Sequence, residues 1–360
     1  MTIYYVLYAS LFIGAALKNF FAKNEKNKHL FCFFAFLLIA GMLALRHPNM
    51  GIDLAYGSPY GYLGNFETIG SSDWQHVLSG DFANYEKGYV VFCKFISYFG
   101  NNDQVLLIAC AIISTAAFSW FIYKYSCNCL VSFVVWMGLP VFLANFSALR
   151  QVIAIAITVF AFKCIKDKKI LPFILLVLLA STFHKSAILF LVAYPAYYLR
   201  VPKKMQLLLA GALPVIYFLR YPLFNLFSKI LKDDAVPDDN NAITLFLVFA
   251  ALYVFLVMYS DASDGNGMCN LFWLACCCQA LGGVYSTAIR VGYYFMVYLI
   301  LLLPHSLDYM KRHLKDADFT HRFFLIVILL AFTAFGLYSL YTTYWSMSYP
   351  YYFCWQKYLL

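Results

Sequence analysis

The sequence predicts an all-α, polytopic membrane protein with about twelve transmembrane helices. Of its 360 residues, 63% are hydrophobic and only 12% are charged, so polar residues are too few to cover a water-soluble globule. The apolar residues form repeated blocks of roughly 18 to 22 residues, and not the ten-residue alternation of an outer-membrane barrel. The chain is therefore expected to be a single transmembrane domain, residues 1–360.

Each apolar block is long enough to cross a bilayer, or nearly so, and the blocks are taken as spans in chain order. The predicted spans are 3–21, 30–45, 104–123, 130–146, 149–165, 170–183, 186–199, 205–220, 242–259, 268–285, 289–306 and 323–345. The first block has no basic region before it and no small-residue cleavage site after it, so we expect a retained helix and not a signal peptide.

The stretch 145–154 interrupts an apolar run that extends from Leu130 to Phe162. This run is too long for one crossing, because a hydrocarbon core of roughly 30 Å needs only about 20 helical residues. An arginine at mid-membrane costs about 2.5 to 3.5 kcal/mol, so the chain should turn at the polar residues around Arg150. Arg150 is then expected at a membrane face, at the start of a helix, either as a functional residue or as an anchor that reaches the headgroups.

Basic residues predict the orientation of the spans, because cytoplasmic loops carry an excess of lysine and arginine. Lysines and arginines follow the first, third, fifth, seventh and eleventh predicted spans, which places all these loops on one side. Both termini and the segments 46–103 and 221–241 are then extracytoplasmic. Within 46–103, the apolar residues of 85–99 have helical spacing and predict an interfacial helix. The acidic segment 221–241 is interpreted as a solvated loop, and it lacks EF-hand spacing for calcium.

Several polar residues are predicted at extracytoplasmic helix ends or in the long outer segment. They are Arg46, Asp53, Glu86, Arg150, Gln151, His184, Lys185 and Arg290. Basic residues on this side run against the usual charge bias, and a binding site for an anionic group would explain them. Arginine suits phosphate through its rigid fork of donors, and helix amino-termini add partial positive charge.

The same residues have simpler interpretations. His184 can be a hydrogen-bonded cap or a catalyst, and Asp53 and Glu86 can each be a general base or the ion-pair partner of an arginine. Aromatic residues of the outer segment can stack on sugars or form an interfacial belt. The net charge of +9 lies in loops between helices, which indicates topology and not nucleic-acid binding. The 11 cysteines lie mostly in apolar blocks without ligand spacing, which argues against disulfides and a zinc site.

Six short motifs in order give the chain a resemblance to a known family. They are Arg46 with Gly51-Ile52-Asp53, Glu86-Lys87-Gly88-Tyr89, Ser147-Ala148-Leu149-Arg150-Gln151-Val152-Ile153-Ala154, His184-Lys185-Ser186-Ala187, Arg290-Val291-Gly292-Tyr293-Tyr294-Phe295 and Tyr349-Pro350-Tyr351. The succession resembles the EpsG family of Wzy-type polymerases, which act on bacterial polysaccharide repeat units. The glycine-rich residues 57–72 are interpreted as an insertion into this pattern.

The resemblance implies a metal-independent glycosyltransferase without a cofactor, in the bacterial cytoplasmic (inner) membrane with its active site facing outward. It would polymerise undecaprenyl-diphosphate-linked repeat units, donor and acceptor both, into O-antigen, capsule or exopolysaccharide. The lipid bilayer and a chain-length-regulating membrane protein are the implied partners, and nucleic acid is not one. The implied base is His184, then Glu86, then Asp53. Arg150, Arg290 and Arg46 would bind the diphosphate, and Gln151, Lys185, Tyr89, Tyr293 and Tyr294 would bind the rest of the substrate.

Three alternatives stay open at this point. A flippase or transporter of lipid-linked sugars would favour charges along a central path and an internal repeat of spans, and the sequence contains no such repeat. A membrane O-acyltransferase would also use an arginine and a histidine in a polytopic chain, but its acyl donor would arrive from the cytoplasm. An O-antigen ligase uses the same donor chemistry as a polymerase, and sequence separates the two poorly.

Overall fold

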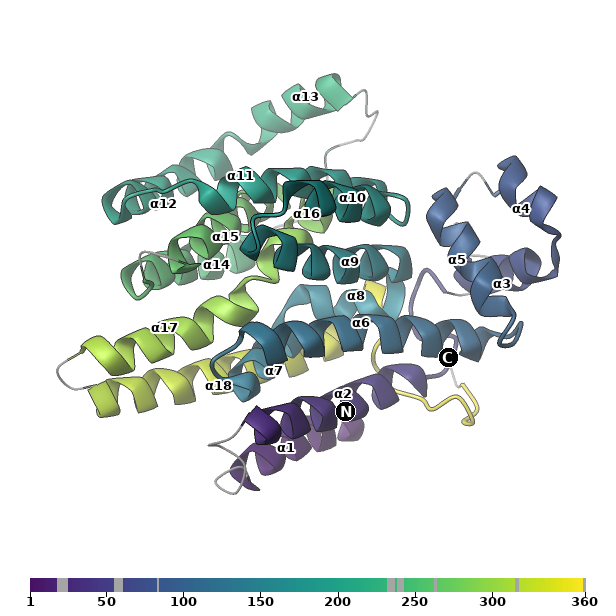
Figure 1. Ribbon diagram of the computed structural model, residues 1–360, viewed down its shortest axis with the longest axis horizontal. Helices are drawn as coiled ribbons and strands as arrows, with labels where there is room; N and C mark the ends of the chain where they lie inside the picture. Colours follow the sequence, from purple (N-terminus) through teal and green to yellow (C-terminus); the bar gives the residue numbers. More distant parts are fainter. Residues whose placement is uncertain are drawn as a thin grey trace. The chain divides into compact units, whose positions relative to one another are not determined.

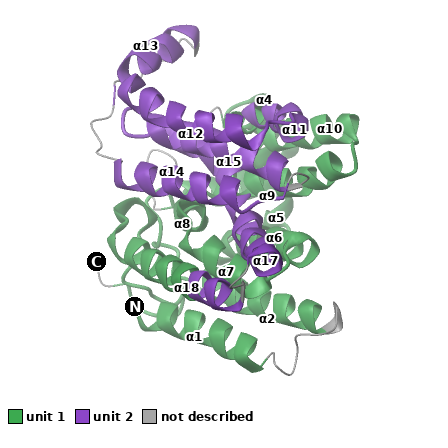
Figure 2. Cartoon of the chain, turned by 90° about the vertical axis from the view of Figure 1, so that its left-hand side faces the viewer, with its two compact units in different colours: residues 1–188, 326–360 green, residues 189–325 purple. Residues whose placement is uncertain are grey.

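The computed structural model describes residues 1–17, 25–54, 61–82, 84–231, 237, 243–261, 264–314 and 317–358. Within these ranges the protein is all-α, as predicted, and its one β-bridge joins Arg46 to Phe353 (Figure 1). The chain divides into two compact units, unit 1 with residues 1–188 and 326–360 and unit 2 with residues 189–325 (Figure 2).

Unit 1 contains the first ten α-helices and most of the last one. They are α1 (Thr2–Ala16), α2 (Glu25–Ala44), α3 (Tyr62–Ser71), α4 (Trp74–Ser79), α5 (Lys87–Ser97), α6 (Asp103–Tyr125), α7 (Cys129–Gly138), α8 (Pro140–Ser147), α9 (Leu149–Lys166), α10 (Ile170–Ser181) and α18 (Ala317–Thr342). A 3-10 helix, η2 (Lys185–Val192), crosses into unit 2.

Unit 2 is built around α15 (Asp264–Leu281), which contacts most of its other helices. These are α11 (Ala193–Tyr198), α12 (Lys203–Phe218), α13 (Arg220–Leu231), α14 (Ile243–Met258), α16 (Ser286–Met296) and α17 (Leu299–His313). Buried amides tie α12 to α15, since Gln206 Nε2 donates to Asn270 Oδ1 at 3.0 Å. The Nδ2 of the same Asn270 donates to the carbonyl of Leu199 at 2.7 Å.

Several described helices are apolar enough for a membrane. Residues 27–44 of α2, the whole of α6 and residues 318–342 of α18 are each long enough to cross one, and three bent pairs (α7 with α8, α12 with α13, α16 with α17) add up to three more. The other predicted spans correspond to helices that are shorter or less apolar, so the count of twelve stays a prediction. The predicted span 130–146 is in fact two helices, α7 and α8, that meet at 62°.

Proline explains the break between α7 and α8. Pro140 is the first residue of α8, a position where its missing N–H leaves no helical bond unmade. The preceding residue is driven out of the helical region by the proline ring, and Leu139 is extended with φ −85° and ψ 146°. The run 130–162 therefore turns twice, at Leu139 and again at Ala148 (φ −87°, ψ 60°), before α9 begins.

The interpretation of 221–241 as a solvated loop was wrong for its first half. Residues 220–231 form α13, which meets α12 at 78°. Its apolar residues recur at helical spacing, so one face can be buried. Phe224 is on that face, only 4% exposed, and its ring packs edge-on against Tyr285. Most of residues 232–241 lie outside the described residues.

One end of unit 1 gathers the helix ends that the predicted alternation of spans places on the outer side. There α3 and α5 pack on the starts of α6 and α9 through a shared apolar core that includes Phe66, Cys93, Leu107 and Ile153. The end of α2 is tied to the same place, because Gln104 Nε2 of α6 donates to the carbonyls of Ala44 and Arg46. The described part of the segment 46–103 is thus a helical cap on unit 1, and α5 matches the helix expected within 85–99.

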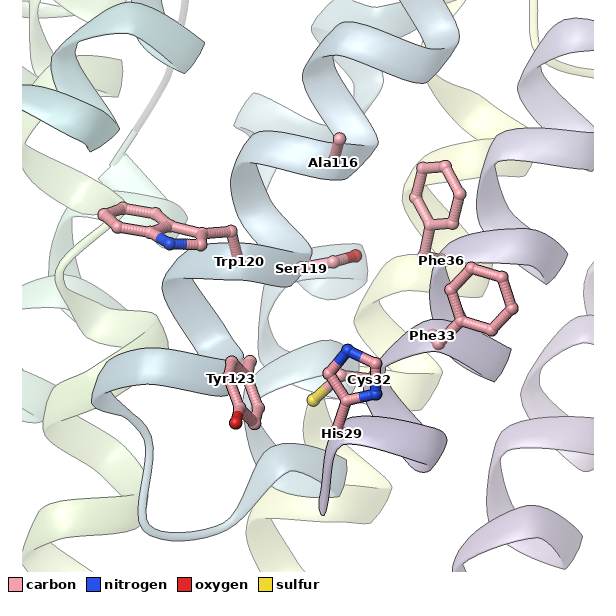
Figure 3. Close-up of a pocket in the computed structure, with 8 residues that line it drawn as sticks. All are labelled: His29, Cys32, Phe33, Phe36, Ala116, Ser119, Trp120 and Tyr123. Atoms are coloured by element: carbon pink, nitrogen blue, oxygen red, sulfur yellow. The ribbon is translucent and has the colours of Figure 1, made fainter. Parts of the chain in front are cut away.

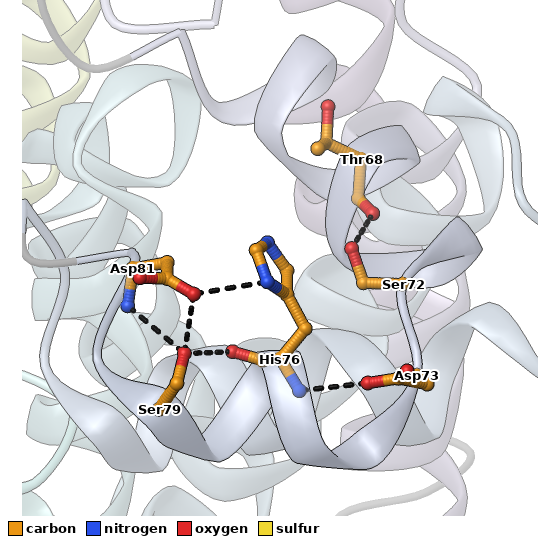
Figure 4. Close-up of polar contacts among 6 residues, drawn as sticks. All are labelled: Thr68, Ser72, Asp73, His76, Ser79 and Asp81. Carbon is orange, nitrogen blue, oxygen red and sulfur yellow. Dashed lines mark hydrogen bonds and ion pairs between the residues drawn. The ribbon is translucent and has the colours of Figure 1, made fainter.

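Side chains close the turns within this cap (Figure 4). Ser72 Oγ donates to the Thr68 carbonyl at the end of α3, at 2.8 Å. Asp73 Oδ1 then accepts the backbone N–H of His76 at 2.7 Å, which is the usual N-cap of a helix. His76 Nδ1 lies 2.9 Å from Asp81 Oδ2 on the exposed surface. These contacts order the cap without involving the charged residues expected at the site.

The membrane side of the cap can be tested by labelling in intact cells with a membrane-impermeant thiol reagent. We expect Ser79→Cys, on exposed α4, to add labelling to that of the parent chain, because the charge pattern places 46–103 outside. Lys168→Cys, exposed between α9 and α10, should add labelling only after the membrane is permeabilised. The reverse pattern would overturn the orientation.

Candidate active site

Arg150 is the centre of a polar cluster beneath the cap. Its Nη1 lies 2.5 Å from Glu86 Oε2 and donates to the Asn84 carbonyl at 3.3 Å, while Nε donates to the Tyr62 hydroxyl at 3.0 Å. The Arg150 and Glu86 side chains are each only 11% exposed. The guanidinium also lies over the rings of Tyr62 and Tyr85, 5.6 Å and 5.0 Å from their centroids, at cation–π distance.

The local folding of α5 and α9 brings the two charges together. Arg150 is the second residue of α9, and the neighbouring Leu149 anchors the helix start in the apolar core. Glu86 is the N-cap residue of α5, where a negative charge is favoured by the helix dipole. Its second oxygen, Oε1, accepts the backbone N–H of Lys185 at 3.1 Å. Glu86 therefore joins α9 to the turn that follows α10.

Gly88 allows α5 to approach that turn. Its backbone N–H donates to the Thr182 carbonyl at 2.9 Å. A Cβ at this position would lie 2.1 Å from Thr182 Oγ1 and 2.8 Å from the Thr182 carbonyl oxygen, which no side chain tolerates without displacement. The glycine of the Glu86-Lys87-Gly88 motif thus sets the distance over which Glu86 reaches Lys185.

A second close approach places the segment 51–54 against the α8–α9 hinge. Gly51 has φ +131°, and a Cβ on it would lie 2.0 Å from the Phe146 carbonyl oxygen, so glycine is required there. Ser147 Oγ accepts the Ile52 N–H at 3.0 Å and donates to the Trp345 carbonyl at 2.5 Å. Asp53 follows, half-buried, and its carbonyl accepts the backbone N–H of Tyr62 at 3.1 Å.

Tyr62 stays a neutral phenol in this cluster. Burial raises its pKa to about 12, although the Arg150 guanidinium beside it favours the phenolate. Arg150 therefore has one full negative charge among the partners described above, that of Glu86. The tyrosine contributes an oxygen acceptor and an aromatic face.

Other predicted residues lie close by. His184 directly precedes Lys185, is half-buried, and has Nδ1 2.7 Å from Ser186 Oγ. Lys185 itself is exposed, whereas Gln151 next to Arg150 is buried. Tyr89 is also buried, at 1% exposure, and its ring packs edge-on against Tyr62. The structure thus brings Asp53, Glu86, Tyr89, Arg150, Gln151, His184 and Lys185 together in unit 1.

Arg46 is on the other side of the hinge, where the C-terminal segment covers it. It pairs with Phe353 through the β-bridge and is only 1% exposed. Burial lowers its pKa to about 10, so it stays charged at neutral pH. Nη1 donates to the Leu43 carbonyl at 3.2 Å and the guanidinium lies over the Phe146 ring, but Nε and Nη2 have no hydrogen-bond partner among the described residues.

The remaining predicted residues lie in unit 2, on α16. Arg290 is exposed and lies one turn after the first helical residue, Ser286, and not at the helix start as the predicted span implied. Tyr293 is 6% exposed, and Tyr294 is fully buried with its ring 6.4 Å from that of Phe190.

Sequence reasoning missed three partners of Arg150, which are Tyr62, Asn84 and Tyr85. Tyr62 comes from the stretch 57–72 that was interpreted as an insertion, yet part of this stretch forms α3 and carries a direct hydrogen-bond acceptor for Arg150. Asn84 acts through its carbonyl, which leaves no trace in the sequence. Only the position of Tyr85 directly before Glu86 could have drawn attention to it.

The apolar helices, with a charged cluster buried at one end of unit 1, define a polytopic membrane protein. Comparison with known protein families gives its identity: residues 29–354 match the EpsG family, and the chain belongs to it. The family is associated with Wzy-type polymerases, which places the protein in polysaccharide biosynthesis. No curated protein and no solved structure matches the chain.

We expect Gly88→Ala to destabilise the protein and to separate Glu86 from Lys185, because the new methyl group collides with Thr182. Gly41→Ala is the matched control, since a Cβ on Gly41 meets nothing within 4 Å and alanine stabilises a helix by roughly 0.5 to 1 kcal/mol relative to glycine. Thermal unfolding of both variants in detergent would measure the difference. An unchanged midpoint for Gly88→Ala would contradict the close approach.

Glu86→Ala should lower the free energy of unfolding by about 3 to 5 kcal/mol, because it leaves the largely buried Arg150 charge without its carboxylate. Asp167→Ala removes the carboxylate of an exposed ion pair, in which Lys163 is 45% and Asp167 37% exposed, and should have a much smaller effect because solvent screens both charges. The double variant Glu86→Leu/Arg150→Met should recover much of the loss, since it removes both charges. Equal effects of Glu86→Ala and Asp167→Ala on chemical denaturation would refute this structural role.

Proposed function

We propose that this protein polymerises lipid-diphosphate-linked oligosaccharide repeat units at the extracytoplasmic face of the bacterial cytoplasmic membrane. The observation that supports this most is the convergence on Arg150 of motifs from four distant parts of the chain. Three of them are in direct contact, since Arg150 binds Glu86 and Glu86 binds the N–H of Lys185. The fourth, around Asp53, is joined to Tyr62 by a backbone bond.

The proposed reaction is a glycosyl transfer from undecaprenyl diphosphate. A hydroxyl oxygen of the acceptor repeat unit attacks the anomeric carbon of the donor glycan, and the bond from that carbon to the diphosphate oxygen breaks. The hydroxyl proton passes to a base, and the undecaprenyl diphosphate leaves with the electron pair. Negative charge therefore grows on the diphosphate, and this is the charge that the protein has to stabilise.

Arg150 is the residue that we assign to the leaving diphosphate. Its guanidinium is at the amino-terminal end of α9, where the helix dipole adds partial positive charge. Glu86 holds this guanidinium in place and is assigned as a positioning residue, because one of its oxygens binds Arg150 and the other binds Lys185 N–H. Because both oxygens of Glu86 are engaged in these contacts, we place Glu86 after His184 as a candidate for the base.

His184 is the proposed base. Its half-buried ring adjoins the Lys185 peptide that contacts Glu86, and the Nδ1 contact with Ser186 Oγ at 2.7 Å fixes the ring orientation. Nε2 would then accept the proton of the acceptor hydroxyl. Asp53 is the second candidate. Gln151, Lys185 and Tyr89 are proposed to shape the substrate site on unit 1, and the assignments of Arg46, Arg290, Tyr293 and Tyr294 rest on their sequence motifs.

Arg150→Lys should reduce the amount of polymer roughly tenfold or more, while the protein is present at its normal level. Lysine keeps the charge, but a single ammonium cannot reproduce the donors that bind Tyr62 and Glu86 in one plane. Arg290→Lys tests the second predicted arginine in the same way. Arg312→Lys is the matched control, because this arginine forms an exposed ion pair with Asp308.

Lipid-linked glycans extracted from cells would give the readout, with single repeat units expected to accumulate on the outer side. Full-length polymer in Arg150→Lys cells would refute the proposed role of Arg150. Accumulation on the cytoplasmic side would instead indicate a flippase. Free polymer that is made but not attached to its lipid acceptor would indicate a ligase.

A further inference from the structure

A cavity opens between α2 and α6, far from the Arg150 cluster. It has a volume of about 300 Å³ and is lined by His29, Cys32, Phe33, Phe36, Ala116, Ser119, Trp120 and Tyr123 (Figure 3). The start of α6 packs against the cap through Leu107, and Ala116 lies nine residues further along the helix, or about 14 Å at 1.5 Å per residue. The cavity therefore lies in the half of the α2–α6 pair that is farther from the cap.

The walls of this cavity are apolar and partly open. Phe33 is 50% exposed, and Figure 3 shows Phe33 and Phe36 on α2 and Ala116, Ser119, Trp120 and Tyr123 on the neighbouring α6. Trp120 extends the wall toward α9, since its ring lies 4.7 Å from that of Phe160, which is itself 39% exposed. A surface of this kind suits an acyl chain.

Basic side chains border one end of the cavity. Lys28 Nζ lies 5.5 Å from the centroid of the Tyr123 ring, and His29 packs edge-on against the same ring at 5.5 Å. Lys124 Nζ lies 5.4 Å from the centroid of the Trp120 ring. Both lysines are thus held against aromatic walls of the cavity, on the side that the charge pattern assigns to the cytoplasm.

A buried hydroxyl lies between the basic end and the apolar walls. Ser119 lines the cavity and is 7% exposed, but its Oγ is buried and has no hydrogen-bond partner among the described residues. A buried hydroxyl without a partner is unfavourable by roughly 1 to 3 kcal/mol. It lies five residues before Lys124, or about 7.5 Å along the helix. The cations therefore lie at one end of the cavity and the apolar wall extends away from them.

We propose that this cavity binds an anionic phospholipid of the cytoplasmic leaflet. Lys28 and Lys124 would contact the phosphate group, and an acyl chain would lie along Phe33, Phe36 and Trp120. The order of cationic end and apolar wall matches the order of phosphate and acyl chain in a glycerophospholipid. The site is independent of the proposed polymerase chemistry, and it would couple the α2–α6 pair to the lipid composition of the membrane.

Trp120 provides a direct readout. The full-length protein would be placed in nanodiscs that contain phosphatidylglycerol or phosphatidylcholine with brominated acyl chains, at equal mole fraction. Bromine quenches tryptophan fluorescence at contact, and subtraction of the signal of Trp120→Phe isolates the contribution of Trp120. We expect stronger quenching by the phosphatidylglycerol, with the preference falling roughly fivefold for each lysine removed in Lys28→Gln and Lys124→Gln.

Two further variants keep the test decisive. Lys168→Gln/Lys169→Gln removes two exposed charges of the same predicted side, away from the cavity, and should leave the preference unchanged. Ala116→Phe fills the cavity from an exposed position and should reduce quenching by both lipids. Equal quenching by the two lipids in the parent protein, or equal effects of the two lysine pairs, would overturn the proposal and leave an apolar groove without headgroup recognition.

Discussion

The ion pair between Arg150 and Glu86 is the interaction on which the organisation of unit 1 depends. Both side chains are 11% exposed, so neither charge is well solvated, and each needs the other to be tolerated in that place. The two residues belong to different elements, α9 and the start of α5, and Glu86 extends the connection to the turn after α10 through Lys185 N–H. One carboxylate thereby fixes the cap, the hinge and the histidine turn relative to one another.

Sequence reasoning predicted the hinge and much of the cluster for a physical reason. An arginine in a 33-residue apolar run has few tolerable positions, and these lie at a membrane face. The same constraint applies to Glu86 and His184, and the alternation of basic loops assigns all three to one face. In the structure Arg150 contacts Glu86, and His184 directly precedes Lys185, whose N–H binds the same carboxylate. Polarity within an apolar chain was the informative signal.

The parts that could not be predicted depend on contacts without a local pattern. Tyr62 lies 88 residues from Arg150 in the sequence. The glycine-rich stretch 57–72 that contains it was interpreted as an insertion. The C-terminal segment covers Arg46 by backbone pairing, with Cys354 N–H on the Leu45 carbonyl at 2.8 Å, and backbone pairing of this kind leaves no residue signature. The face of α13 that carries Phe224 is another example, because a short amphipathic pattern beside acidic residues favours loop and helix alike.

In the structure the charge of Arg150 is already paired with that of Glu86. This pairing is compatible with binding of a diphosphate, but the diphosphate would have to compete with the Glu86 carboxylate for the guanidinium. A guanidinium buried without a partner would be costly in the empty protein, so the site needs an internal anion. A lipid diphosphate would then share the guanidinium with Glu86 or replace it, and the net gain is the difference between two charge-assisted interactions. In the proposed reaction, such an exchange would give modest ground-state affinity. It would leave the larger stabilisation for the transition state, where negative charge on the leaving group grows and the fixed charge of Glu86 does not.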